Sequence, residues 1–335
     1  MKRTRASELL AKFSEQKLLV VGDVILDKFV WGEVNRFSPE AHTCPILDHT
    51  GQTTMLGGAG NVATNLNALG SCCVSLVGTI GGDPEADELR LLMQEEKLDD
   101  GLLRILDRST TVKTRFVSKG AHLLRYDREV IEPVGQQEEK VLLSTILGVL
   151  TATRGGCHGI IIQDYAKGVV TPSLLRALMG MAKEENVPVF IDPKKEHWYH
   201  FRDAELVKPN LREAMAAFGV SGDDQANHVE QWGRSMLQYT RAKAVIVTQG
   251  EDGMYLFTDE KEIEVLPQPT EVVDVSGAGD TSMATLALSK LAGASWIEAM
   301  VLANAAAGIA VGKRGTSVVT TDKLLDRFSK EENDE

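Results

Sequence analysis

Short apolar runs that each end in polar or turn-forming residues constrain the fold of this chain more than any other feature. The first is KLLVVGD, and four more follow in the second half: GIIIQDY, VPVFIDP, AELVKPN and AKAVIVTQG. Near-continuous apolar runs of this length are typical of strands buried on both faces of a parallel sheet. Helical patterns separate most of them. The sequence therefore predicts an α/β fold, a three-layer sandwich around a mostly parallel central sheet.

Two stretches of period-two alternation interrupt this pattern. KFVWGEV and CPILDHT flank the turn-like segment Asn35–Pro39, and polar and apolar residues alternate again from Thr110 to Glu129. Such alternation is typical of exposed antiparallel strands. We therefore expect a single domain over residues 1–335, with insertions at about 28–55 and 104–128 that form a small β-sheet lid.

Composition excludes several classes of partner. The formal net charge of -12 argues against a nucleic-acid-binding protein, but it leaves small anionic substrates open. No apolar run approaches the roughly 20 residues of a membrane span, and the start MKRTRASELLAKF lacks the apolar core of a secretory signal. The adjacent Cys72 and Cys73 form no Cys-x-x-Cys pair and are expected to be buried free thiols. We expect a protein of the reducing cytoplasm, without nucleic-acid or membrane partners.

The run DVSGAGD, Asp274–Asp280, carries the strongest functional signal. Gly277, Ala278 and Gly279 stand where an alanine-rich helical pattern begins. Unpaired backbone N–H groups at such a start point towards one place, the helix dipole adds positive potential there, and the combination suits an anion. Asp280 would lie at the edge of this place, able to accept a proton from a hydroxyl that attacks a phosphoryl group. A glycine turn with an N-capping Asp is the simpler alternative for the motif alone.

A second glycine motif, GAGNVA at Gly58–Ala63, matches the G-x-G-x-x-A pattern of dinucleotide-binding proteins, and Asp83 lies twenty residues after it. That pattern belongs directly after the first strand, whereas more than thirty residues of hairpin character intervene here. We instead expect the glycines to admit a polyol close to the backbone, with Asn61 and Asn65 offering hydrogen bonds. Tight packing of a helix on the sheet is the alternative.

Polar residues at the ends of the predicted strands form further candidates. Asp23 and Asp27 suit sugar hydroxyls or could cap a turn, and Lys167 could bind a phosphate or remain solvated. Asn210 and Glu213 could hold a hydrated magnesium ion through its waters, or form a capping box.

Thr248–Gly250 ends another strand and could line a nucleotide pocket or make a turn. Each site has a simple structural explanation when taken alone. However, the carboxyl ends of parallel strands meet at one edge of a sheet, where ligands bind in open α/β folds. Six successive strand ends carrying such residues favour a shared binding edge.

These stretches resemble the ribokinase-like carbohydrate kinase family of the phosphofructokinase-B type, over nearly all of residues 15–325. Its two hallmark segments are similar to GGAGNVATN and DVSGAGD. The resemblance implies an ATP-dependent sugar kinase, built as an α/β sandwich closed by a β-sheet lid. It implies that Asp280 activates the acceptor hydroxyl, and that the N–H groups of Gly277, Ala278 and Gly279 bind the charge that develops on the transferred group.

The resemblance also implies three ligand sites. Magnesium would be held through water by Asn210 and Glu213. The nucleotide site would comprise Lys194, Asn210, Glu213, Thr248, Gly250 and Asn304. A monovalent cation such as K⁺, used by only some members, would be held chiefly by carbonyl oxygens of Asp274, Ser276, Ala310, Lys313 and Gly315.

The strings VVGDVILDKFVWGEVNRFSPEA, DYAKG, DPK, KPN and VTQGEDGM most resemble members that phosphorylate the anomeric hydroxyl of a heptose 7-phosphate, for ADP-heptose and lipopolysaccharide core synthesis. The implied sugar site comprises Asp23, Asp27, Arg36, Ser38, Glu40, Gly58, Asn61, Asn65, Arg125, Asp164 and Lys167. Of these, Arg36, Ser38 and Glu40 would reach the sugar from the lid, and Arg125 and Lys167 would bind its phosphate. His42-Thr43-Cys44 and Gln163 depart from the pattern, which leaves other sugars open. A fused cytidylyltransferase-like half is not expected after Glu335.

Two other classes remain as alternatives. A nicotinamide-dependent oxidoreductase would need its glycine motif after the first strand, and a noncatalytic nucleotide sensor of the same fold would usually lack Asp280. Exposed strands in the lid also favour a homodimer that pairs edge to edge.

Overall fold

The computed structural model describes residues 1–152, 156–220, 228–260, 262–265, 274–312 and 318–329. Over these residues the central layer is a nine-stranded sheet, in the order β13-β12-β11-β10-β9-β8-β1-β4-β5. Its strands are β1 (Lys17–Gly22), β4 (Cys73–Ile80), β5 (Asp99–Arg104), β8 (Gly159–Gln163), β9 (Val189–Asp192), β10 (Leu206–Val207), β11 (Ala244–Thr248), β12 (Met254–Phe257) and β13 (Glu262–Val265). Only β12 and β13, at one end, pair antiparallel. The predicted α/β fold with a mostly parallel sheet is confirmed.

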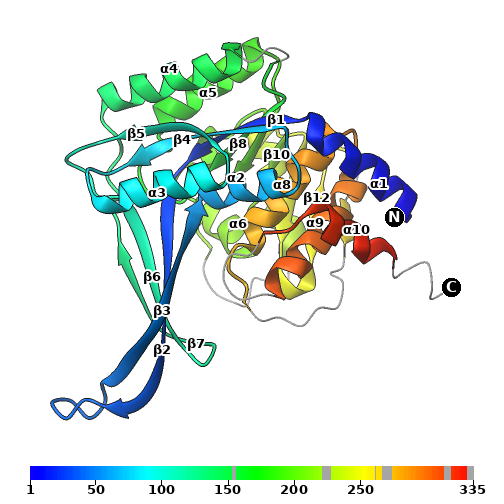
Figure 1. The fold of residues 1–335 in the computed structure, drawn as a ribbon. Helices are drawn as coiled ribbons and strands as arrows, with labels where there is room; N and C mark the ends of the chain where they lie inside the picture. The colour runs from blue at the N-terminus through cyan, green and yellow to red at the C-terminus, as the bar shows by residue number, and fades with distance from the viewer. Residues whose placement is uncertain (153–155, 221–227, 261, 266–273, 313–317, 330–335) are drawn as a thin grey trace.

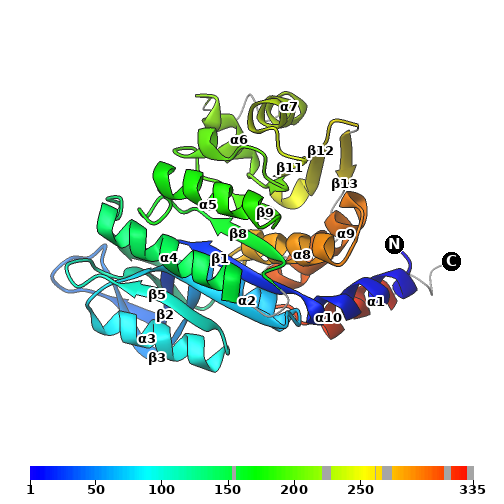
Figure 2. The ribbon, with the colours of Figure 1, turned by 90° about the horizontal axis from the view of Figure 1, so that it is seen from above.

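Helices cover both faces of this sheet (Figure 2). One face carries α4 (Gln136–Ala152), α5 (Pro172–Glu184), α6 (Leu211–Ala217) and α7 (Val229–Thr240). The other carries α1 (Arg3–Ala11), α2 (Ala59–Ala68), α3 (Pro84–Glu95), α8 (Ala278–Leu291), α9 (Trp296–Val311) and α10 (Thr321–Ser329). The described residues also include the short 3₁₀ turns η1 (Lys12–Glu15), η2 (Trp198–His200) and η4 (Gly250–Asp252). The three layers follow from strands that are apolar on both sides.

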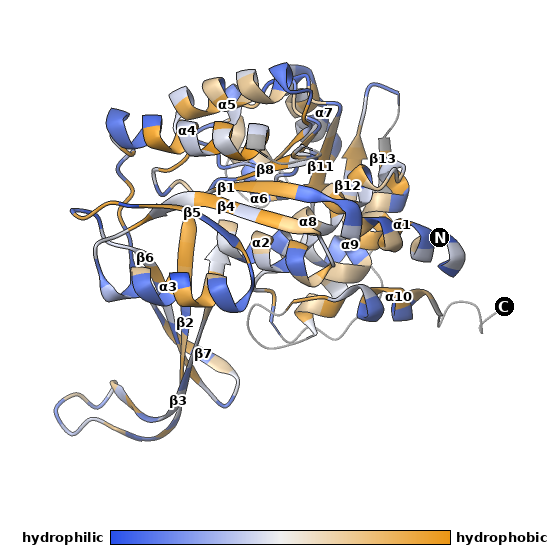
Figure 3. Cartoon of the chain, turned by 45° about the horizontal axis from the view of Figure 1, so that its top comes forward, coloured by the Kyte–Doolittle hydropathy of each residue, from blue (hydrophilic) through white to orange (hydrophobic). Residues whose placement is uncertain are grey.

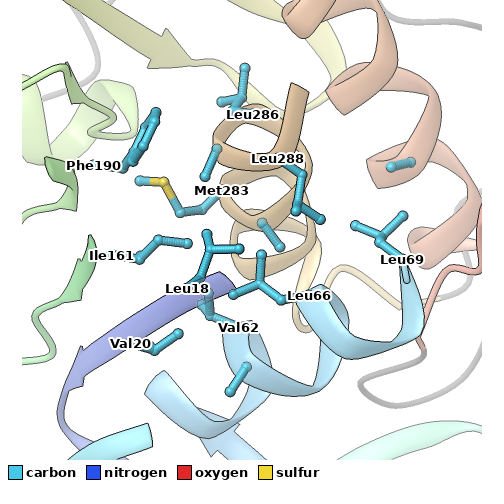
Figure 4. Packing of buried hydrophobic residues seen from close by; sticks show 14 of the residues in the cluster. Leu18, Val20, Val62, Leu66, Leu69, Ile161, Phe190, Met283, Leu286 and Leu288 are labelled. Carbon is cyan, nitrogen blue, oxygen red and sulfur yellow. The ribbon is translucent and has the colours of Figure 1, made fainter. Parts of the chain in front are cut away.

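Alternate residues of each central strand enter two different hydrophobic cores. In β1, Leu18 and Val20 pack with α2 and α8, whereas Leu19 and Val21 pack on the opposite face with α4 and α5. Figure 4 shows the first core, in which Leu66 and Met283 approach the strands from α2 and α8. Each fully buried aliphatic side chain contributes about 1.5–3 kcal/mol, so burial on both faces strongly stabilises the central sheet. It is also among the most apolar parts of the chain (Figure 3).

A second sheet, in the order β3-β2-β6-β7, projects from the body (Figure 1). Its strands are β2 (Val24–Phe37), β3 (Pro45–Gly58), β6 (Thr111–Ser118) and β7 (Ala121–Arg128). The hairpin of β2 and β3 was predicted with its turn at Asn35–Pro39, but the strands pair as far as Phe37 and Pro45. That turn position was wrong because the chain bulges beside Val34 and then continues the ladder. We call this sheet the lid; the division of the chain into one domain with two insertions stays a prediction.

All four cysteines are free, as expected for Cys72 and Cys73. The prediction that Cys72 and Cys73 are buried is wrong. Cys72 is exposed and Cys73 is only partly buried, because they lie where β4 enters the sheet at its amino edge. Within the described parts of the chain, no helix has both the length and the apolar character needed to cross a membrane.

Candidate active site

The glycine-rich turn before α8 forms one wall of a small cavity. Gly277 has φ of 82°, in the left-handed region that favours glycine, and α8 begins at the next residue. This turn directs the chain into the helix so that Gly277 and Gly279 line the cavity beside Asp280. The first amides of a helix have no partner in the preceding turn and carry the positive end of its dipole. The wall is therefore suited to an anion.

The cavity, of about 160 Å³, lies at the carboxyl ends of β8 to β11. The structure brings together here eight predicted site residues: Asp164, Lys194, Asn210, Glu213, Thr248, Gly277, Gly279 and Asp280. Four more lining residues were not among the predicted site residues: Gln163, Tyr165, Asp192 and Lys208. The expected convergence of strand ends at one edge accounts for this arrangement.

Asp280 is buried, and three side chains donate hydrogen bonds to its carboxylate. Asn61 Nδ2 lies 2.7 Å from Oδ2, while Gln163 Nε2 and the Tyr165 hydroxyl lie 3.0 and 2.9 Å from Oδ1. These donors come from α2 and from the end of β8, so elements far apart in sequence fix one rotamer of Asp280. The carboxylate is held on the cavity wall, beside the amides that begin α8.

Burial raises the pKa of Asp280 to about 7, against the lowering effect of the Asn61 hydrogen bond. The nearby Asp192 raises the pKa further, while Tyr165 and Lys208 lower it. A carboxyl group that titrates near neutrality changes protonation state easily at physiological pH. This is the property required of a general base.

Two cations line the same cavity, each beside a carboxylate. Lys208 is buried and its Nζ lies 2.9 Å from Asp192 Oδ2, and Lys194 Nζ is paired with Glu213. Burial alone would lower the pKa of Lys194, but Glu213 outweighs it and the pKa is raised. The cavity thus offers two lysine side chains, each held in place by a carboxylate, beside the first amides of α8, and both kinds of group can donate hydrogen bonds to phosphate oxygens.

Asn210 and Glu213 form a complete capping box at the start of α6. Asn210 Oδ1 accepts the Glu213 N–H at 2.9 Å, and Glu213 Oε2 accepts the Asn210 N–H at 2.9 Å. Carboxylate and amide oxygens retain further lone pairs, so both residues still fit a magnesium ion held through its waters. Among the described residues, no cluster of three or more His, Cys, Asp or Glu could ligate a metal directly.

Asp23 and Asp164 are used to organise the DYAKG loop after β8. The buried carboxylate of Asp23 accepts the N–H groups of Tyr165, Lys167 and Val169 at 2.8, 3.0 and 3.1 Å. Asp164 Oδ1 accepts a further N–H of the loop, and its Oδ2 lies 2.7 Å from His197 Nδ1. Asp23 therefore positions the residues that surround the cavity.

The predicted sugar-binding residues Gly58, Asn61 and Asn65, at the junction of β3 and α2, are all buried. Asn61 reaches Asp280, but Asn65 is fully buried and bonds to Asn61 and to Thr281 on α8. Gly58 has φ of 58°, and an added Cβ would lie 2.4 Å from the Asp23 carbonyl oxygen. Tight packing therefore accounts for Gly58 and Asn65.

The G-x-G-x-x-A pattern at Gly58–Ala63 follows β3 of the lid, not β1. Asp83, the matching acidic residue, caps α3 and bonds to Thr110 and Arg128. Neither lies in the setting that a dinucleotide-binding fold requires.

The remaining predicted sugar-site residues do not line the cavity. Arg36 and Glu40 are exposed at the far end of the β2–β3 hairpin, with Ser38 between them (Figure 1). Asp27 is ion-paired with Arg115 on β6, and Arg125 with Asp127 on β7. Lys167 Nζ lies 2.7 Å from Glu129. The long strands of the lid carry its tip away from the chain's own cleft.

Three further predictions concern Gly250 in η4, Asn304 on α9 and the cation loop before α8. Gly250 and Asn304 do not line the cavity, and Asn304 is buried on α9. In the cation loop, Asp274 Oδ1 accepts the Ser276 N–H at 2.9 Å, and the Asp274 N–H donates to the Val311 carbonyl next to Ala310. Lys313 and Gly315 lie outside the described residues.

The four cavity-lining residues that were not predicted share one feature of the sequence. Gln163 and Tyr165 flank Asp164 at the end of β8, Asp192 ends β9, and Lys208 follows β10. Each therefore occupies a strand end at the binding edge. What the sequence lacks is the direction of each side chain, which depends on the pleat and on tertiary packing.

Comparison with known proteins agrees with this geometry. The pfkB family carbohydrate kinase model matches residues 15–323. The chain is 39% identical to the bifunctional protein HldE of Geobacter metallireducens over all of this chain and 67% of that protein. It is 42% identical to the HldE proteins of Nitrobacter winogradskyi and a Caulobacter species, over 93% and 95% of this chain and 63% and 64% of theirs. The chain thus spans about two thirds of the length of these curated relatives.

Solved structures support the fold. Phosphofructokinase-2 of Escherichia coli, in complex with substrates and products, has a TM-score of 0.76 at 20% identity, covering 94% of this chain and 99% of that one. Arabidopsis thaliana ribokinase with ribose and ATP has a TM-score of 0.69 at 20% identity, covering 93% and 98%. Sugar kinases of this family use ATP and a divalent metal ion. The chain therefore belongs to the pfkB family of carbohydrate kinases, the class of ATP-dependent sugar kinases that its motifs predicted.

Proposed function

We propose that this chain transfers the γ-phosphoryl group of ATP to the anomeric hydroxyl of D-glycero-β-D-manno-heptose 7-phosphate, giving the 1,7-bisphosphate for ADP-heptose and lipopolysaccharide core synthesis. The observation that carries the kinase chemistry is the buried Asp280 beside the amides of Gly277 and Gly279 on one cavity wall. The heptose rests on the resemblance of its sequence strings and on relatives named HldE at 39% and 42% identity.

In the proposed reaction, the acceptor hydroxyl lies against Asp280, which takes its proton as the oxygen attacks the phosphoryl group in line. Negative charge on the transferred group falls on the amides of Gly277 and Gly279, with Ala278 as the third member of the predicted anion hole. Lys208 supplies a fixed positive charge on the same wall. A bound magnesium ion would neutralise phosphate charge, held through water by Asn210 and Glu213.

The nucleotide would lie along the ends of β9 to β11, where Lys194 and Thr248 line the cavity. Gly250 and Asn304 would contact its outer part. A potassium ion near Asp274 and Ser276 would stabilise the turn that precedes α8. Phosphofructokinase-2 of E. coli, which is similar in fold, has a structure in complex with potassium, and this supports the proposed potassium ion.

An ADP-release assay over phosphorylated hexoses, phosphorylated heptoses and free sugars tests the proposal. We expect the heptose 7-phosphate to give the highest kcat/KM, with an anomeric phosphate in the product by ³¹P NMR. Activity confined to free hexoses would contradict the heptose assignment and leave a pfkB-family kinase for another sugar. Reduction or oxidation of a nicotinamide cofactor without ADP release would contradict both.

We also propose that the lid pairs with the lid of a second copy. Among the described residues, β3 and β7 are the outer strands of the lid, and β7 exposes Leu124 and Tyr126 to solvent at 61% and 59%. Exposed strand edges bearing apolar side chains are natural pairing surfaces. In such a homodimer the tip with Arg36, Ser38 and Glu40 would serve the partner's cleft, because it points away from its own.

A further inference from the structure

A second cavity lies at the opposite edge of the central sheet from the catalytic cleft. It has a volume of about 1020 Å³ and borders the amino ends of β9, β10 and β11, between α5, η2 and the end of α8. β9 runs from this cavity to the catalytic cleft, and at roughly 3.3 Å per residue its two ends are about 10 Å apart. We call this cavity the amino-edge groove. It is a separate site, and nothing in the proposed reaction uses it.

Positive charge is concentrated in the amino-edge groove although the chain carries a net charge of -12. Its lining includes five Lys and Arg residues but only two acidic ones, namely Arg176, Lys183, Arg202, Lys243 and Lys290 against Asp203 and Glu205. Lys243 is paired with Glu205 at 2.7 Å, and Asp203 with Arg241 at 2.9 Å. In the part of the chain that the structure describes, Arg176, Lys183 and Arg202 have no carboxylate partner. The groove therefore has unbalanced positive charge.

One wall of the groove carries Arg176 and Lys183, for which the described residues provide no carboxylate partner. His200 lies on this wall, and its pKa is lowered by burial and then by the charges of Arg176 and His197. Arg176 and Lys183 project from α5 two helical turns apart, on the side that lines the groove. An anion placed here would relieve the repulsion, and phosphate groups fit such clusters well.

Aromatic rings line the groove next to these cations. Tyr199 and Tyr239 are 50% and 37% exposed, with ring centroids 5.9 Å apart, and both pack on the buried Trp198. The Arg202 guanidinium lies 5.2 Å from the Tyr239 ring centre. A rigid ring with one open face offers a stacking surface for a planar heterocycle. The combination of flat rings and free cations distinguishes this groove from a general anion site.

We propose that the amino-edge groove binds a nucleoside phosphate, with its base against Tyr199 and its phosphates against Arg176, Lys183 and His200. The volume is sufficient, since small-molecule pockets measure about 300–1,000 Å³. This site is additional to the nucleotide position in the catalytic cleft. It does not depend on which sugar the kinase phosphorylates.

Proton NMR titration of the His200 imidazole, assigned with His200→Gln, tests the proposal with ADP as probe. ADP should shift the His200 signal saturably and raise its pKa, because a phosphate anion favours the imidazolium. The double variant Arg176→Ala/Lys183→Ala should lose this shift while its kinase activity stays within about twofold. The matched variant Lys140→Ala/Lys323→Ala removes the same charge elsewhere and should keep the shift.

Three outcomes would overturn the proposal. The first is no saturable shift up to about 10 mM ADP. The second is an undiminished shift in Arg176→Ala/Lys183→Ala, since the signal would then originate in the catalytic cleft. The third is equal binding of ADP and pyrophosphate to the unmodified protein, which would remove the nucleoside from the assignment. With the base on the ring, Tyr199→Ala should weaken ADP binding about tenfold and leave pyrophosphate binding unchanged.

Discussion

At the scale of single residues, the chemistry depends on the environment of Asp280. Its carboxylate is buried, accepts hydrogen bonds from Asn61, Gln163 and Tyr165, and has a pKa raised to about 7 by burial. The hydrogen bonds oppose the effect of burial because they stabilise the charged form. The balance between these two effects sets the pH at which the base becomes available.

The pH dependence of kcat/KM should report this balance. Below about pH 7 Asp280 is protonated and cannot accept the substrate proton, so kcat/KM should fall about tenfold per pH unit on the acid side. Tyr165→Phe removes a donor to the carboxylate and should move this limb to higher pH. Tyr239→Phe, distant from the cleft, should leave it in place. A limb that is unmoved in Tyr165→Phe would contradict the assigned role of that hydroxyl.

The contribution of Asp280 to the unfolding free energy should decrease as the pH rises, whereas kcat/KM should increase. Because the pKa of Asp280 is raised in the folded chain, the protonated form is the stabilised one, and this contribution is present below about pH 4 and lost as the pH rises through 7. Asp280→Asn does not titrate. The unfolding free energy of the unmodified chain, measured in urea relative to that of Asp280→Asn, should therefore be lower at pH 8 than at pH 5. A difference independent of pH would contradict the raised pKa.

At the scale of elements, the loop after β8 depends on a carboxylate that is distant in sequence. Asp23, at the end of β1, accepts three N–H groups from this loop. Asp23→Asn retains one acceptor oxygen and turns an NH₂ group towards backbone donors. It should destabilise the chain by about 1–3 kcal/mol and increase hydrogen exchange at Tyr165, Lys167 and Val169.

The exposed Asp107→Asn is the matched control for Asp23→Asn, and its stability should change by less than about 0.5 kcal/mol. Unchanged exchange in the loop of Asp23→Asn would show that these hydrogen bonds do not hold it.

The elements also show what the sequence can predict. Short apolar runs ending in polar residues predicted β8 to β11 and the edge at which they meet, because burial on both faces leaves a continuous apolar pattern. The same patterns could not show that Asp23 bonds to backbone while Asp280 faces a cavity, since both are acidic residues at element ends. That difference is created by the partners that tertiary packing supplies.

The connection from β9 to β10 illustrates the same limit. It carries Lys194 at the catalytic cleft, then His197 against Asp164, and then His200 in the amino-edge groove. In the sequence this is one polar segment without periodicity. Only the parallel crossing of the sheet places its two ends at opposite edges.

At the scale of the whole molecule, the proposed pairing of two lids would bury the exposed Leu124 and Tyr126 of β7. Leu124→Glu/Tyr126→Glu places charges on β7 and should halve the mass found by light scattering, with loss of most kinase activity. Leu147→Glu, at a comparably exposed apolar position on α4, should leave mass and activity unchanged. A monomeric mass for the unmodified chain would contradict lid pairing and leave the catalytic cleft unaffected.

The central claim is that Asp280 accepts the proton of the attacking hydroxyl, and single-turnover phosphoryl transfer by Asp280→Asn tests it most directly. With ATP and sugar phosphate both shown to bind by calorimetry, the account predicts transfer slowed by on the order of a hundredfold or more at pH 8. Transfer at a near-normal rate, with the cleft occupied by both substrates, would contradict it.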